Sequence, residues 1–168
     1  MMPITLRRLK LSAANSLVVA ALIATGSAFA QAPAPPAEPG DHPLNIKSQD
    51  IKWEKAVPEL GSGSPEIAIL HINPQNRATQ LMIRVPKDFH VPPHWHSANE
   101  THTILAGTFI VRPAGGSREE LGPGSFNYIP RGTVHQAWTK PDEGALLFIT
   151  VDGAWDVNWT EGPPAARK

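Results

Sequence analysis

The stretch PPHWHSANETHTILAG (residues 92–107) places three histidines and a glutamate within a span of nine residues. His94 and His96 are separated by one residue, so on a β-strand both side chains point to the same face. Glu100 opens the β-like run that follows, where its carboxylate can lie across from the two imidazoles if the strands pair antiparallel. The stretch therefore indicates either a metal site or the polar face of an ordinary surface strand.

A second stretch, PRGTVH (residues 130–135), bears on this choice. A histidine pair with this spacing is common on strands and by itself says little about metal binding. The glutamate strengthens the metal interpretation, because a buried carboxylate without a partner is costly. Two nitrogen donors and one oxygen donor make three legs of a transition-metal site. The fourth ligand has to come from elsewhere, and His135, which follows a Pro-Arg-Gly turn, is the best candidate.

Short β-like runs, rich in β-branched and aromatic residues, make up most of the chain around these stretches. Turn signals such as Asn73-Pro74 and the Gly-Pro-Gly of residues 122–124 separate them. After the N-terminal region, no stretch of ten residues keeps a helical period without Pro or Gly, apart from a turn near residues 51–56. This pattern predicts an all-β sandwich or barrel. The runs are residues 67–72, 79–85, 101–106, 107–112, 125–129, 134–138 and 145–151.

Residues 1–30 have the pattern of a secretory signal peptide. Three basic residues and no acidic residue come before an apolar, alanine-rich run (residues 17–24), and Ala28-Phe29-Ala30 fits a cleavage site. The apolar run is shorter than the roughly 20 residues that a spanning helix needs, so an uncleaved membrane anchor is the weaker alternative. We expect a periplasmic or secreted protein with no stable membrane anchor after cleavage.

Two further segments are expected to lie outside the folded domain. Residues 31–43, QAPAPPAEPGDHP, are rich in proline and alanine, which predicts a disordered linker. Residues 161–168 are predicted to form a short flexible tail. Residues 44–160 would then form a single β-barrel domain.

The composition excludes several classes of function. The chain has 15 basic and 15 acidic residues, and loss of the leader would leave 12 basic residues and a net charge of −3. A mildly acidic protein without a basic run is not expected to bind nucleic acid. The chain has no cysteine, which removes disulfides, thiol nucleophiles and thiolate metal ligands. Stability must come from the apolar core, helped by a metal or by oligomerisation.

The two stretches together resemble the two motifs of the cupin superfamily. The first cupin motif is H-x-H, three or four residues, Glu, six residues and Gly, and it occurs here as HWHSANETHTILAG (residues 94–107). The second is Gly, five residues, Pro-x-Gly, two residues and His, and it occurs as GSFNYIPRGTVH (residues 124–135). Two positions depart from the pattern: Asp88 stands where a glycine is usual, and Thr139 where an asparagine often closes the second motif.

The resemblance implies a double-stranded β-helix, or jelly-roll barrel, formed by a single cupin domain over roughly residues 66–152. It also implies one divalent transition metal (Fe, Mn, Ni, Cu or Zn) held by three imidazoles and one carboxylate, and it favours a homodimer over a monomer. The positions that match the ligands of the family are His94, His96, Glu100 and His135.

Other residues near the motifs have several interpretations. His102 shares strand parity with Glu100 and should face the interior. There it could bind the metal, act as an acid/base group beside it, or be a hydrogen-bonded core histidine, which is the commonest role of a buried polar group. Phe126 and Tyr128 alternate toward the face predicted for the ligands and are candidates for a pocket wall, although such residues are more often core. WDVNW (residues 155–159) could form an added strand or an intersubunit contact.

Three classes of function remain, because a fold does not determine a function. We favour a metal-dependent, dioxygenase-like oxidoreductase that acts on a small organic substrate, since this ligand set leaves coordination positions free. His102 is the acid/base candidate in that interpretation. The second class is a non-catalytic module that binds or senses a small ligand or a metal. The third, a sugar isomerase or epimerase, fits less well because the layouts of those enzymes differ.

Overall fold

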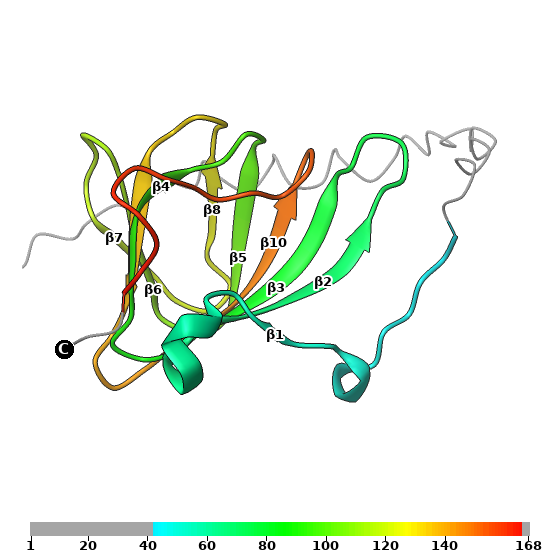
Figure 1. Cartoon of the computed structure of the whole chain (residues 1–168), viewed down its shortest axis with the longest axis horizontal. Helices are drawn as coiled ribbons and strands as arrows, with labels where there is room; N and C mark the ends of the chain where they lie inside the picture. The colour runs from blue at the N-terminus through cyan, green and yellow to red at the C-terminus, as the bar shows by residue number, and fades with distance from the viewer. Residues whose placement is uncertain (1–41, 166–168) are drawn as a thin grey trace, which may run out of the picture. The chain divides into compact units, whose positions relative to one another are not determined.

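The computed structural model describes residues 42–165 (Figure 1). The predicted signal peptide and most of the predicted linker lie outside the described residues, as do the last three residues of the predicted tail. Within the described part of the chain, no helix is both long enough and apolar enough to cross a bilayer.

Two antiparallel sheets form opposite walls of a barrel (Figure 1). The larger sheet has the strand order β1-β2-β3-β10-β5-β8, and the smaller has the order β11-β4-β9-β6-β7. Neighbouring strands thus often come from distant parts of the sequence, as in a jelly roll. The strands are β1 Glu54–Lys55, β2 Glu66–Ile72, β3 Thr79–Val85, β4 His90–Trp95, β5 Glu100–Gly107, β6 Phe109–Pro113, β7 Glu119–Leu121, β8 Phe126–Ile129, β9 His135–Thr139, β10 Ala145–Val151 and β11 Asn158–Trp159.

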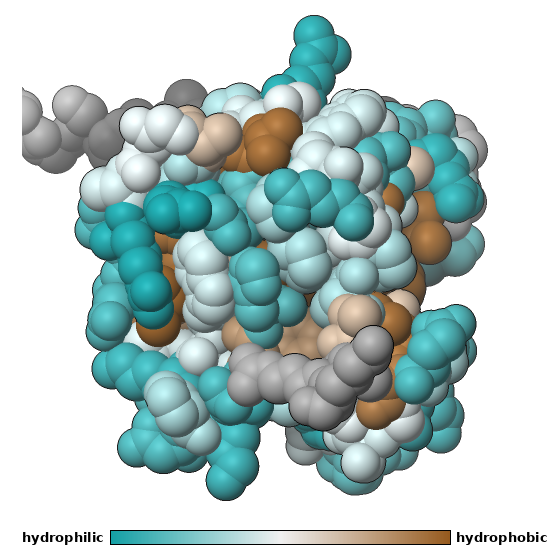
Figure 2. All heavy atoms as spheres, turned by 60° about the vertical axis from the view of Figure 1, so that its left-hand side comes forward, coloured by the Kyte–Doolittle hydropathy of each residue, from teal (hydrophilic) through white to brown (hydrophobic). Residues whose placement is uncertain are grey.

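Strand β10 shows how alternation along a strand builds the core. Its inward residues are buried and its outward residues only half-buried, as expected for a strand with one face on the core. Leu147 and Ile149 meet inward side chains of both sheets, and each such buried side chain contributes about 1.5–3 kcal/mol to stability. One outer face of the molecule, by contrast, carries mostly hydrophilic side chains around smaller hydrophobic areas (Figure 2).

The all-β prediction is confirmed, and each of the predicted β-runs is a strand whose ends lie within two residues of the prediction. The helical turn near residues 51–56 was wrong. That segment contains β1, and short 3-10 helices lie on either side of it, η1 at Ser48–Asp50 and η2 at Pro58–Gly63. Of the two interpretations of WDVNW, the added strand is present as β11, which pairs with β4.

The two residues that depart from the cupin pattern lie close together, Asp88 in the loop after β3 and Thr139 at the end of β9. Asp88 adopts a left-handed conformation with φ of 54°, which glycine adopts freely and aspartate tolerates better than most residues. Its N–H donates to the carbonyl of Lys140 at 2.8 Å. The hydroxyl of Thr139 donates to the carbonyl of Pro86 and accepts from the N–H of Phe89. Asp88 and Thr139 therefore keep the loop and the end of β9 joined without the usual residues.

Gly107 fixes the far end of β5 against the segment that leads into β10. A Cβ atom at this position would lie 1.9 Å from the carbonyl oxygen of Gly144, and the φ of Gly107 is 72°. Both space and conformation therefore demand glycine. This glycine of the first motif serves the barrel and not the chemistry of the site.

Candidate metal centre

Three histidines from the smaller sheet converge inside the barrel. His94 lies on β4, His96 directly follows that strand, and His135 opens β9 as the cross-strand partner of His94. All three are buried, and the atoms that they could offer to a metal lie within 4.8 Å of one another. The structure thus brings these three predicted residues together in a group that could hold one metal ion.

Each of these imidazoles is held by a main-chain carbonyl at Nδ1. His94 donates to Pro92 at 2.7 Å and His135 to Thr133 at 3.0 Å, while His96 donates to Asp156. A proton on Nδ1 leaves Nε2 as the free donor atom in the neutral ring, and such outer hydrogen bonds orient metal-binding histidines. His94 and His135 therefore have the tautomer that a metal site requires, and His96 has the same anchor at Nδ1 while its Nε2 lies beside Glu100.

A pair of prolines in β4 makes one of these carbonyls available. Proline has no N–H to give to a strand ladder, and the pairing of β4 with β9 is interrupted between Val91 and His94. The carbonyl of Pro92, inside this interruption, accepts from the ring of His94. The carbonyl of Pro93 accepts from the N–H of Thr160, beyond β11.

Glu100 and His102 enter the same interior from β5 of the larger sheet. One carboxylate oxygen of Glu100 lies 3.0 Å from Nε2 of His96 and 3.0 Å from Nε2 of His102, and the other accepts from the indole N–H of Trp155 at 3.1 Å. His102 also bonds through Nδ1 to the side chain of Asn127 at 2.7 Å. Glu100 thus contacts His96. It does not belong to the group of His94, His96 and His135, whose possible ligand atoms all lie within 4.8 Å of one another.

Burial favours the neutral form of two of the histidines. It lowers the pKa of His94 to about 3, helped by the nearby ring of His135. Burial also lowers the pKa of His135 to about 4, against the hydrogen bond to Thr133, which raises it. Neutral imidazole is the form that binds metals, so protons compete only weakly at these two positions.

His96 and Glu100 shift in the way expected of an ion pair. Burial acts to lower the pKa of His96, but the hydrogen bond and the charge of Glu100 outweigh it and raise the pKa. Burial acts to raise the pKa of Glu100, but the charge and hydrogen bond of His102, together with those of His96, hold it well below its usual value. The carboxylate is therefore ionised beside the histidine group.

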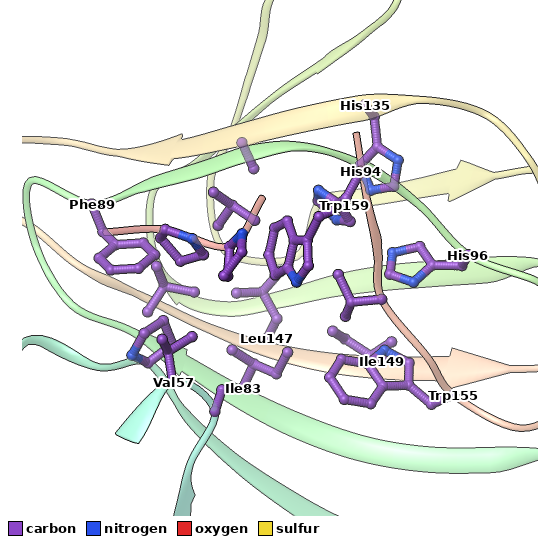
Figure 3. A pocket seen from close by; sticks show the side chains of 18 of the residues that line it. Val57, Ile83, Phe89, His94, His96, His135, Leu147, Ile149, Trp155 and Trp159 are labelled. Carbon is purple, nitrogen blue, oxygen red and sulfur yellow. The ribbon is translucent and has the colours of Figure 1, made fainter. Parts of the chain in front are cut away.

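The histidines lie at one end of a cavity of about 520 Å³. Figure 3 shows them at that end, with Phe89 and Val57 at the other. The wall between is mainly apolar, and the cavity is within the size range of small-molecule sites. Its lining includes Ile83, Leu147, Ile149, Trp155 and Trp159.

The expectation that Phe126 and Tyr128 wall the pocket was wrong. Both side chains are exposed, at 62% and 52%, and neither lines the cavity. In the pairing of β8 with β5, Asn127 stands opposite His102, so Asn127 faces inward and its two neighbours face outward.

Residues 152–160, here called the strap, complete the site and were not recognised as functional from the sequence. The strap supplies the carbonyl of Asp156 to His96 and the indole N–H of Trp155 to Glu100. Trp159 adds a wall beside His94, with ring centroids 5.2 Å apart. The one signal in the sequence was the pair of tryptophans after the last long strand, which allowed an added strand or an intersubunit contact but indicated no role in the site.

Comparison with protein families identifies the barrel. The family described as Cupin domain matches residues 81–152, which hold both motifs. This match ends where the strap begins. A search among curated proteins gives no match.

Several solved structures are similar to the chain. The polyketide cyclase RemF from Streptomyces resistomycificus is 23% identical with a TM-score of 0.59, over 71% of this chain and 86% of that one. The DMSP lyase DddQ from Ruegeria pomeroyi DSS-3 is 18% identical with a TM-score of 0.58, over 80% and 82%. An RmlC-like cupin from Shewanella frigidimarina is 20% identical with a TM-score of 0.54, over 65% and 89%. At these identities the likeness concerns the fold.

Proposed function

The chain belongs to the cupin superfamily, and from this premise we propose that it is a metal-dependent enzyme with dioxygenase-like activity on a small organic substrate. The observation that carries the proposal is the shared orientation of His94, His96 and His135. Each ring is tied at Nδ1 to a main-chain carbonyl, which leaves Nε2 as the atom that would bind one divalent transition metal (Fe, Mn, Ni, Cu or Zn). In His96 this atom lies 3.0 Å from the carboxylate of Glu100, and a bound metal ion would take the place of the proton between them.

Glu100 is proposed as the fourth ligand. Its nearer oxygen lies 3.0 Å from Nε2 of His96, which is about the separation of two adjacent ligand atoms that each lie about 2.1 Å from one ion. The carboxylate is ionised, as a ligand has to be.

The bound ion would supply Lewis acidity or redox chemistry at the inner end of the cavity. The protein itself would exclude water from that end, orient the substrate along the apolar wall, and donate or accept protons. His102 is suited to the last task, because it bonds to Glu100 on one side of its ring and to Asn127 on the other.

The enzyme interpretation is supported by the polar groups that share the cavity with the histidines. Both Glu100 and His102 line it, whereas Phe126 and Tyr128, which could have sealed it, do not. The alternative is a non-catalytic module that binds a small ligand or senses a metal. Its support is that both oxygens of Glu100 already have partners, so this carboxylate is not free to act as a base.

The test is metal analysis of the purified protein, followed by dioxygen-uptake assays with catechols, flavonols and dicarboxylates after each candidate metal is restored. We expect one metal ion per chain and uptake with at least one substrate. The His102→Gln variant should keep the metal and lose most of the uptake. One ion per chain without uptake for any metal and substrate would instead support the binding module.

We also propose that the protein is exported to the periplasm or beyond and forms a homodimer. Support for export comes from the leader pattern of residues 1–30. Cell fractionation together with the mass of the mature chain tests export, with Gln31 expected as the first residue. Light scattering of the purified protein tests the dimer, and a monomer mass would refute it.

A further inference from the structure

The cavity is divided into a polar end and an apolar body. Its inner end holds the three histidines with Glu100 and His102. Along the rest of the wall, most of the lining residues are aliphatic or aromatic, among them Phe89, Leu147 and Ile149 (Figure 3). A ligand bound here therefore meets donors and acceptors at one end and hydrocarbon along the remainder.

Among the described residues that line the cavity there is no lysine or arginine. The arginine of β3, Arg84, is exposed and does not line the cavity. It pairs with Glu66 at 3.2 Å and lies 3.8 Å from the centre of the Trp53 ring. Within residues 42–165, the one charged lining group away from the inner end is Glu59, an exposed carboxylate on η2.

From this division we infer that the site takes a molecule with oxygen donors at one end and an uncharged, apolar, ring-sized body. This inference rests on the proposed function, because the metal held by the histidines would receive the oxygen donors. It adds the class of substrate. The end of the ligand that binds the metal can be anionic, but the body of the ligand carries no anionic group.

The physical reason is the cost of desolvation. A carboxylate on the body would lose its hydration against Leu147, Ile149 and Trp159, and the described lining offers it no lysine or arginine in exchange, only the uncharged indole N–H of Trp159. The negative charges of Glu100 and Glu59 would oppose it further. A hydrocarbon group in the same place gains from leaving water, at roughly 25 cal/mol per Å² of buried apolar surface.

Calorimetric titration of the zinc-loaded protein with two catechols tests the inference. Zinc has no redox chemistry, so binding is measured without turnover. 4-tert-Butylcatechol and 3,4-dihydroxybenzoate have the same chelating oxygens and differ at one position of the ring, which bears a hydrocarbon group in one and a carboxylate in the other. We expect the first to bind at least about 10-fold more tightly, as the unpaired carboxylate requires.

Equal binding, or tighter binding of the carboxylate, overturns the inference, and so does a zinc-loaded protein that binds neither compound. In these cases the metal content stays at one per chain, so the proposed metal site stands. A protein that does not take up zinc overturns the metal site first, and the inference with it. The two failures are therefore distinguishable by metal analysis before any ligand is added.

A charge placed at the outer end of the cavity provides a matched variant. Glu59→Lys should narrow the preference for the uncharged catechol several-fold, because it reverses the sign of the one charged group there. Glu54→Lys makes the same change of charge on β1, outside the lining, and should leave the preference unchanged. Equal effects of both variants would mean that the preference reflects the overall charge of the protein and not the cavity.

Discussion

The two sheets contribute to the site in different ways. The smaller sheet brings in three histidines, and each is held at Nδ1 by the carbonyl of a peptide group. The larger sheet brings in Glu100 and His102 on β5, and these are held by other side chains, namely Trp155 and Asn127. The metal-binding half is thus supported by the backbone, and the carboxylate half by side chains.

This difference determines which properties of the site a single substitution can alter. A backbone carbonyl remains when its residue is replaced, so the orientation of the histidines is insensitive to single changes around them. Side-chain partners can be removed one at a time, so the charge and position of Glu100 can be altered without touching the histidines. Metal binding should therefore be robust, and proton handling should be adjustable.

The largest expected effect comes from removing a histidine of the group. His135→Ala should weaken metal binding by more than about 100-fold, beyond the 10–100-fold range that loss of an outer partner costs. His96→Ala should do the same. Metal content after dialysis, and competition with a chelator, measure this. Retention of full binding by either variant would remove that residue from the ligand set.

His90→Ala is the matched control for these variants. His90 lies on the same strand as His94 but stacks on Trp138, with ring centroids 5.1 Å apart, and bonds to Gln136. It should keep one metal ion per chain.

The next effect concerns the stability of the metal-free protein in acid. The pKa values of His94 and His135 are about 3 and about 4 in the folded chain, against an ordinary value of 6.5. Between these values the unfolded chain binds more protons, so the free energy of unfolding falls as the pH drops from 6.5 toward 3. Glu100 also has a lowered pKa, so it too makes the free energy of unfolding fall as the pH drops below the ordinary range of a glutamate. Urea unfolding of chelator-treated protein at pH 7 and pH 4.5 measures the difference.

His96 affects the pH dependence of stability in the opposite direction, because its pKa is raised in the folded chain. Its contribution is fully present below pH 6.5 and is lost as the pH rises through the folded value. Because the lowered pKa of His94 is one source of the loss of stability in acid, a His94→Gln variant should lose less stability between pH 7 and pH 4.5 than the natural chain. A chain whose stability does not change between pH 7 and pH 4.5 would contradict the neutral, buried state of the two histidines.

A smaller effect is expected from the carboxylate half. Trp155→Phe keeps the ring but removes the N–H that bonds to Glu100, which leaves one buried oxygen without that partner at a cost of about 1–3 kcal/mol in stability. Metal affinity should fall by about 10-fold or less, as for other outer partners. Trp159→Phe, in the same cavity wall, is the control and should change metal affinity less. If the two variants behave alike, the hydrogen bond to Glu100 has no special role.

The smallest effect belongs to the outer surface of the larger sheet. Phe126→Ser and Tyr128→Ser remove exposed aromatic side chains that do not line the cavity. Metal content and the binding of catechols should be unchanged. A loss of either would mean that the outer face of this sheet acts on the interior.

The three histidines of the metal-binding half could be predicted from the sequence, although the anchor of His96 at Asp156, 60 residues away, could not. A period of two places His94 and His96 on one face, and the turn before His135 places that residue at the start of β9, the strand that pairs with β4. The two motifs carry this spacing directly. The same parity placed His102 inside, beside Glu100, as the structure has it.

The carboxylate half could not be predicted in the same detail because its partners are distant. Whether Asn127 or its neighbours face inward depends on the register of β8 on β5, and a shift of one residue reverses it. The contact of Trp155 with Glu100 joins residues 55 apart in the sequence. No local period encodes such a contact.

The place of the strap in the sequence has a consequence for the biogenesis of the protein. The carbonyl of Asp156 that orients His96 lies after every residue of the histidine group, so synthesis reaches it last. A nascent chain that has passed His135 contains all the candidate ligands, yet one imidazole still lacks its anchor. Metal acquisition in its final form must therefore follow translation of the strap, and a chain cut at residue 152, the end of the family match, should load metal poorly even if its barrel forms.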